Sequence, residues 1–333
     1  YYRISSMGID DPIGYVASVI MVIASLVALW GSTWIMRGKE YSTLQRGGTN
    51  IARRQLKPWQ AVLAYGWISL VLIVVLSPHL GILLLSLSKV WSYSVVPDVY
   101  TLDNYVTVFR DSIGMMLNTV LYCSLAAGLD VIIGTAIAYL ILRTKLAGRQ
   151  WLDFVATGAI AIPGVVLGIG YLRTFKDFQL PFTDEPFTAF WLIIVIAYAV
   201  RRLPYALRSC TAALQQLHVS LEEAAENLGA SKNRTIYRVV VPLMAGGILA
   251  GFVTSFLTAA VELSATIMLV TAQSNAPMSY GIYLYMQSIA GRGPGAALGV
   301  IAVIIVALGT YFSNRLIRNR AAGHETQMLK SGV

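Results

Sequence analysis

The sequence is poor in charged residues and in cysteine. Only 12% of its 333 residues are Asp, Glu, Lys or Arg, about half the share that soluble globular proteins carry. The two cysteines, Cys123 and Cys210, lie in or beside apolar stretches, so a framework of disulfide bonds is excluded. The shortage of charge excludes a soluble globular domain and a disordered, charge-rich chain.

Motifs for ATP chemistry and for metal binding are also missing. A phosphate-binding loop needs Gly, four residues, Gly and Lys; Gly246 and Gly251 have this spacing, but Phe252 occupies the lysine position. The three histidines are far apart in the sequence and lack the spacing of metal ligands: His79, His218 and His324. We therefore expect no enzymatic activity, no metal site and no cofactor in this chain.

Long apolar stretches dominate what is present, because 56% of the residues are hydrophobic. A helix of about 20 residues crosses the hydrocarbon core of a bilayer. The stretches are continuous, whereas the strands of a membrane barrel alternate apolar and polar residues. We predict an all-α protein that crosses the membrane several times. The seven predicted spans are 13–36, 60–88, 113–142, 151–174, 187–207, 242–270 and 296–316.

Basic residues gather on alternate connections between the predicted spans. Of the 25 Lys and Arg residues, 19 lie in four connections: 37–59, 143–150, 201–241 and 315–333. Because Lys and Arg are retained on the cytoplasmic side of membrane proteins, these connections are predicted to be cytoplasmic. The net charge of +9 is therefore a consequence of topology and does not indicate nucleic-acid binding.

A weak internal repeat suggests that the chain belongs to a longer protein. A shift of 282 residues places Tyr1 on Tyr283 and the apolar stretch 13–36 on residues 295–318. The first span then corresponds to the last span of a preceding half. The division that we predict is a final helix and cytoplasmic linker of that half, a six-helix domain and a cytoplasmic tail: residues 1–58, 59–320 and 321–333.

The connection 201–241 is predicted to be ordered. Ser220 precedes Glu223 by three residues, which is a capping-box pattern for a helix start, and Gly229 is typical of a helix end. Between them, four apolar residues recur at helical spacing: Leu221, Ala224, Ala225 and Leu228. A second, basic helix is expected to follow and to lead into the next span: Lys232, Arg234, Arg238 and Pro242.

This pattern resembles the EAA loop in the permeases of ABC importers, which are driven by ATP. Glu223-Ala224-Ala225 is followed after three residues by Gly229, and after nine more by Val239-Val240-Val241-Pro242. Val241 replaces the more usual Leu. The similarity extends over about 60–320 through three further segments: Leu117-Asn118-Thr119, Arg201-Arg202-Leu203-Pro204-Tyr205 and Glu262-Leu263-Ser264-Ala265-Thr266. It is greatest to ferric-iron permeases, which are often fusions of two six-helix halves.

The resemblance implies a type I ABC importer permease in the cytoplasmic (inner) membrane of a prokaryote. Two cytoplasmic ATPase subunits, which carry the ATP and Mg²⁺, would each grip one loop, with Glu223 facing a basic residue. The other implied partners are a second permease half and an extracytoplasmic substrate-binding protein. Ferric iron is the first expected substrate, followed by a phosphonate, a sugar phosphate or a thiamine-like solute. The implied coupling residues are Leu221, Glu222, Glu223, Ala224, Ala225, Leu228, Gly229, Ala230, Ser231, Arg234 and Pro242.

Polar residues inside the predicted spans are candidates for the transport pathway or its gate. The candidates are Glu262, Ser264, Thr266, Pro163, Gly164, Asn118 and Asp130. For Glu262 and Asp130 the alternative role is a hydrogen bond that locks two helices together. For Pro163 and Gly164 the alternative is ordinary helix packing.

Two other functions remain open from the sequence. An ion-driven secondary transporter is expected to have inverted repeats and several acidic residues in mid-membrane. Here the two copies of the repeat run in the same direction, and only one or two acidic residues lie in mid-membrane. A membrane assembly subunit without transport is the second alternative. Only the importer requires a partner with a phosphate-binding loop, so a search for such a partner discriminates among the three.

Overall fold

The computed structural model describes residues 12–36, 56–91, 94–180 and 186–331. Within these residues the chain is helical, and its only extended pairings are two isolated bridges. The all-α prediction is confirmed. The predicted repeat and the predicted linker fall in part on residues 1–11 and 37–55, which lie outside the described residues.

In the part of the chain that the structure describes, four helices are long and apolar enough to cross a membrane without interruption. They are α2 (Pro12–Met36), α3 (Pro58–Ser86), α5 (Ile113–Arg143) and α15 (Arg292–Ser331). Such helices satisfy every backbone donor and acceptor internally, which lipid requires because it offers no hydrogen bonds. In α2 and α3 none of the apolar span is buried within the chain, so these faces are open to lipid or to another subunit.

Two of the predicted spans are bent. The first pair of helices turns by 106° and the second by 69°, so the described residues contain four continuous spans, or up to six if each bent pair crosses once. The first pair is α6 (Arg149–Gly158) with η1 (Ala159–Ala161), followed by α7 (Gly164–Thr174). The second is α10 (Lys232–Thr235), η3 (Ile236–Val240) and α11 (Val241–Leu243), followed by α12 (Ala245–Ala260).

The structure differs from the seven predicted spans in two respects. Residues 151–174 and 242–270 are broken helices, and α8 (Leu192–Gln215) is not among the spans that length and composition identify. The second difference arises because α8 carries three arginines: Arg201, Arg202 and Arg208. Each is a costly residue in lipid unless the protein surrounds it.

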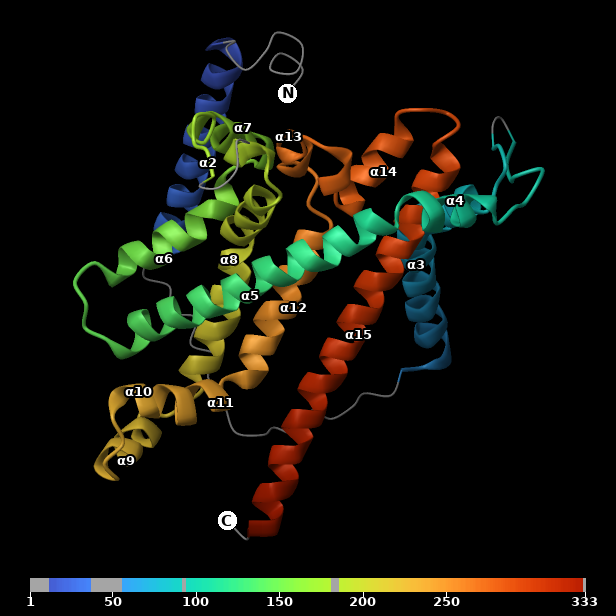
Figure 1. The fold of residues 1–333 in the computed structure, drawn as a ribbon. Coiled ribbons are helices and arrows are strands. Elements are labelled where there is room, and N and C mark those ends of the chain that lie inside the picture. Colours follow the sequence, from blue (N-terminus) through green and yellow to red (C-terminus); the bar gives the residue numbers. More distant parts are fainter. Residues whose placement is uncertain (1–11, 37–55, 92–93, 181–185, 332–333) are drawn as a thin grey trace.

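Helices α5, α8 and α12 pack against one another and form the middle of the molecule (Figure 1). Helix α3 lies along α15 on one side. At the lower end of Figure 1, toward which α15 runs, lies the pair formed by α9 (Ser220–Asn227) and α10. At the opposite end lie α4 (Asp103–Asp111) and α14 (Met278–Met286).

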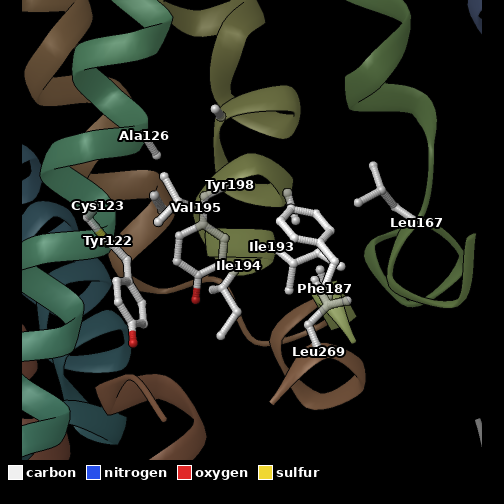
Figure 2. Close-up of a cluster of buried hydrophobic side chains, with 14 residues drawn as sticks. Tyr122, Cys123, Ala126, Leu167, Phe187, Ile193, Ile194, Val195, Tyr198 and Leu269 are labelled. Carbon is white, nitrogen blue, oxygen red and sulfur yellow. The ribbon is translucent and has the colours of Figure 1, made fainter. Parts of the chain in front are cut away.

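The largest buried cluster lies between α5, α8 and the segments around them. Figure 2 shows its side chains, with the hydroxyl of Tyr198 inside the cluster. Tyr122 of α5 stacks on Trp191 at the start of α8, with ring centroids 5.4 Å apart. Cys123 is a buried free thiol in this cluster, and Cys210 is a buried free thiol in a second cluster farther along α8. This core fixes α8 relative to α5 and therefore positions the arginines of α8.

Candidate functional site

The segment of residues 219–235, which we call the α9–α10 loop, is a helix, a tight turn and a second helix. Helix α9 ends in a Schellman turn, in which the Gly229 N–H donates to Glu226 O (2.9 Å) and the Ala230 N–H to Ala225 O (3.0 Å). Gly229 has φ +86°, a left-handed conformation that side chains disfavour. The predicted helix end at Gly229 is therefore confirmed. Glycine suits this position because it adopts a positive φ without strain.

The start of α9 differs from the prediction. The N-cap residue is Val219, and no side-chain cap forms, so the capping box of Ser220 and Glu223 is wrong. Instead, the His218 ring lies against the first turn. Its Nδ1 accepts the Ser220 N–H at 3.3 Å and lies 2.8 Å from Ser220 Oγ. The ring thus supplies an acceptor for a backbone donor that the first turn leaves unpaired.

The apolar residues of α9 are exposed rather than packed. Leu221 is 45% exposed and Leu228, at the turn, is 90% exposed. Glu223 and Ala224 are also exposed. The loop therefore presents two leucines and a carboxylate on its outer face.

Glu222 is the member of α9 that turns inward. Its exposed fraction is 9%. Its carboxylate accepts hydrogen bonds from Arg143 Nε (2.6 Å) and from the Tyr139 hydroxyl (3.2 Å), both on the last turns of α5. Glu222 was among the coupling residues that the resemblance implied, and its side chain is paired within the chain.

The remaining predicted coupling residues occupy the second half of the loop and the following turns. Ser231 is the exposed N-cap of α10, Arg234 is exposed on α10, and Ala230 is half-buried. Pro242 lies in the short helix α11, just before the bend into α12. The helix between α10 and α11, η3, has π geometry, which is frequent at functional positions in helices.

A second group of predicted residues meets around a buried carboxylate. Glu262 is 4% exposed and forms ion pairs with Arg202 Nη2 and, at 3.2 Å, with Arg201 Nε. The Arg201 pair lacks hydrogen-bond geometry at Nε. We call these three residues the Glu262 cluster. Two arginines facing one carboxylate leave a net positive charge inside the helix bundle.

Glu262 also forms hydrogen bonds at the break between α12 and α13 (Thr266–Leu269). Its Oε1 accepts the Ala265 N–H at 3.2 Å, and its own carbonyl accepts from Thr266 Oγ1 (2.7 Å) and Ser279 Oγ (2.8 Å). An interrupted helix at membrane depth is tolerated only where the protein satisfies the freed backbone groups. Glu262 and its neighbours do so here.

The bend between η1 and α7 lies against this break. A Cβ on Gly164 would lie 2.7 Å from Ser264 Cβ and 3.1 Å from Ala265 N, so only glycine permits this approach. The carbonyl of Ile162 accepts a hydrogen bond from Arg201 Nη1 at 3.4 Å. Five of the predicted pathway residues therefore gather in one place: Pro163, Gly164, Glu262, Ser264 and Thr266.

Asn118 and Asp130 do not join this group. Asn118 Nδ2 donates to the carbonyls of Ser274 (2.7 Å) and Ala276 (3.1 Å), and so ties α5 to the segment before α14. Asp130 is wholly buried and accepts a hydrogen bond from Ser255 Oγ of α12. This contact is the interhelical hydrogen bond that was the alternative to a pathway role.

Comparisons with known proteins identify the family. The sequence profile described as "binding-protein-dependent transport system inner membrane component" matches residues 130–322, more than half of the chain. The chain belongs to this family. It is a multi-pass membrane permease, a transport component rather than a catalytic subunit.

Curated relatives of this permease include iron and molybdenum transporters. It is 32% identical over 213 residues to the ferric transport system permease protein FbpB of Actinobacillus pleuropneumoniae; the match covers 62% of this chain and 30% of FbpB. It is 30% identical over 208 residues to the molybdenum transport system permease protein ModB of Escherichia coli (strain K12), covering 59% of this chain and 89% of ModB. The chain thus spans about 30% of the length of the ferric relative.

Solved structures confirm the fold of the permease. A bacterial ABC transporter for import of the acidic polysaccharide alginate has a chain that matches with TM-score 0.60 and 17% identity, covering 78% of this chain and 98% of that one. The MetNI methionine ABC transporter, in inward-facing conformations, has a chain that matches with TM-score 0.51 and 14% identity, covering 66% and 98%. The architecture is therefore that of ABC importer permeases.

Proposed function

We propose that the chain forms one transmembrane half of an ATP-driven importer in the cytoplasmic membrane of a prokaryote. The α9–α10 loop is its attachment to a cytoplasmic ATPase subunit, which carries the ATP and Mg²⁺. The observation that carries the proposal is the 90% exposure of Leu228 on a helix end that the Schellman turn holds in place. Family membership and the ABC importer fold support it.

The surface chemistry of the loop suits a helix-in-groove contact. Leu221 and Leu228 offer apolar anchors, and the small Ala224 lets a partner approach the helix closely. The exposed carboxylate of Glu223 is available for a basic residue of the ATPase. Because the loop is already folded, little conformational entropy is lost when it docks.

We place the gate of the transport pathway at the Glu262 cluster. Two broken helices meet there, and the 106° bend before α7 lies against the break before α13. Closure of two ATPase subunits on ATP then tilts the two permease halves as rigid bodies and alternates access to the pathway. An extracytoplasmic substrate-binding protein delivers the substrate, and a second half, fused or separate, completes the pathway.

We propose ferric iron as the substrate. The support is the similarity to the ferric transport permease, while the similarity to the molybdenum permease makes molybdate the comparison of choice. Uptake of radiolabelled ferric iron is measured in proteoliposomes that contain the permease, its ATPase and its binding protein. ATP-dependent uptake that excess molybdate leaves unchanged is the expected result. Uptake of molybdate instead of iron contradicts the choice of substrate, though not the ABC mechanism.

Docking of the ATPase is tested with one substitution and a matched control. Leu228→Asp places a charge in the proposed apolar contact, whereas Leu146→Asp changes a leucine that is 53% exposed in the connection between α5 and α6. We expect Leu228→Asp to raise the Kd for the ATPase by at least about tenfold, as loss of an interface anchor does. Leu146→Asp should leave the Kd unchanged. Equal binding by both variants and the wild type would show that the loop is not the attachment.

A further inference from the structure

The last residue of α5, Arg143, contacts the ends of two other helices. Its Nε donates to Glu222 Oε1 of α9 at 2.6 Å. Its Nη2 donates to Leu217 O at 2.7 Å and to Leu214 O at 3.2 Å, at the C-terminal end of α8. One planar guanidinium therefore joins α5, α8 and α9, a role that a single-point cation such as Lys fulfils poorly.

The ion pair is shielded from water. The side chain of Arg143 is 11% exposed and that of Glu222 is 12% exposed. Tyr139, one turn earlier in α5, donates to the second carboxylate oxygen, so both oxygens of Glu222 are bonded. By contrast, the side chains in the Arg208–Asp153 pair are 56% and 37% exposed, and exposed pairs contribute little. The Arg143 contact is thus the stronger kind of charge-assisted hydrogen bond.

This contact also crosses the joint between α8 and α9. The chain passes from one helix to the other through residues 216–219, a short connection about which α9 could rotate. Arg143 bonds to Leu214 at the end of α8, to Leu217 within the connection and to Glu222 of α9. In the described part of the chain, no other side chain of α9 donates to or accepts from α5 or α8. Without Arg143, only the Tyr139 hydroxyl would still link the Glu222 carboxylate to α5, and no side-chain bond among the described residues would link α8 to α9.

From α8 the contact leads to the proposed gate. The same helix carries Arg201 and Arg202, which hold Glu262 at the break before α13. A movement of α9 that rotates α8 therefore acts on the Glu262 cluster. If α9 moves without α8, the movement is not transmitted to the Glu262 cluster.

We infer that Arg143 is the positioning residue that locks α9 to α5 and α8, so that these helices move as one body when an ATPase pulls on the loop. The inference rests on the proposed function, because the pull comes from the ATPase. It concerns a residue outside the loop itself, at the end of a different helix. It requires that the distance between α9 and the far end of α5 stays constant through the ATP cycle.

Spin labels measure this distance directly. One label replaces Glu226, which is exposed on α9, and the other replaces Leu117, which is 64% exposed near the opposite end of α5. The complex with its ATPase is measured without nucleotide and with ATP plus vanadate. We expect one narrow distance distribution, identical in both states. A shift in the otherwise unaltered complex would overturn the inference, since the helices would then not move together.

Variants at position 143 complete the test. Arg143→Ala should broaden the distribution and shift it when nucleotide binds, while the ATPase still copurifies and hydrolyses ATP. Arg143→Lys should give a distribution of intermediate width, because lysine keeps the charge but lacks the planar guanidinium that bonds to several acceptors. Arg149→Ala is the matched control, since Arg149 also donates to two carbonyls at the end of α5, Ile141 O (3.1 Å) and Thr144 O (2.6 Å), and not to α9. Its distribution should match that of the unaltered complex.

The outcomes separate this inference from the proposed function. If Arg143→Ala behaves like Arg149→Ala, Arg143 is not the lock, even though the ATPase binds. If no ATPase copurifies with the unaltered permease, the proposed function fails first. Retained copurification together with a changed distance in Arg143→Ala alone supports both.

Discussion

Gly229 offers the sharpest test of the loop geometry. At φ +86° an alanine is strained by about 1–2 kcal/mol, the cost of a left-handed conformation for a residue with a Cβ. A Cβ at this position meets no atom within 4 Å, so steric contact adds nothing to that cost. A destabilisation of this size changes the ratio of folded to unfolded turn by a factor of about 5 to 30.

Hydrogen exchange at the Ala230 amide measures the ratio. This N–H donates to Ala225 O only while the Schellman turn is formed. In Gly229→Ala we expect its protection to fall by about 5- to 30-fold, and by less in Gly229→Asn, because Asn tolerates the left-handed region. Gly229→Pro should lose protection altogether, since it removes the N–H that bonds to Glu226 and fixes φ near −65°.

Two glycines serve as controls for this series. Gly148 has φ +82° and open space around it, so Gly148→Ala carries the same strain outside the loop. Gly246 has open space and an ordinary φ, so Gly246→Ala should be harmless. Neither should change exchange at Ala230 or binding of the ATPase. Unchanged protection at Ala230 in Gly229→Ala would refute the reasoning, because the left-handed turn would then not constrain the loop.

Three further predictions concern the membrane-embedded part. Glu262→Ala leaves two buried arginines without their carboxylate and should cost about 3–5 kcal/mol, seen as a lower thermal midpoint in detergent; an unchanged midpoint contradicts the cluster. Gly168→Ala should cost about 1–3 kcal/mol, because its Cβ would lie 2.7 Å from Met268 Cβ, whereas Gly170→Ala in the same helix meets nothing and should be neutral or stabilising. If both behave alike, the packing of α7 is not as described. Asp130→Asn keeps an acceptor for the Ser255 hydroxyl, while Asp130→Val leaves it unpaired at a cost of about 1–3 kcal/mol; equal stability of the two variants argues against the helix-locking bond.

Local features of the loop could be predicted from the sequence because they depend on neighbouring residues. The left-handed turn at Gly229 follows from the special backbone freedom of glycine, and the helix before it follows from the spacing of apolar residues. The start of α9 could not be predicted in the same way. The motif at Ser220 favoured a capping box, but the His218 ring competes for the same N–H, and only the path of the chain decides between them.

Long-range pairing is where sequence reasoning was incomplete. Glu262 stood out as an acidic residue in an apolar span. Its partners Arg201 and Arg202 lie about 60 residues earlier, and the sequence analysis placed them only in the basic connection 201–241 and in a segment of the family resemblance. Arg143 was counted as one cytoplasmic charge among many. Nothing in its neighbourhood signals that it reaches Glu222, which is 79 residues away.

The sequence by itself determined the apolar helices, the side on which basic residues gather and the turn at Gly229, because each depends on composition or on residues within one or two turns. The tertiary structure alone decided where the spans break, which carboxylate of α9 faces inward and which arginines neutralise Glu262. The physical reason is that a buried charge takes whichever partner the packing of helices brings within about 4 Å, and that packing is a property of the whole bundle.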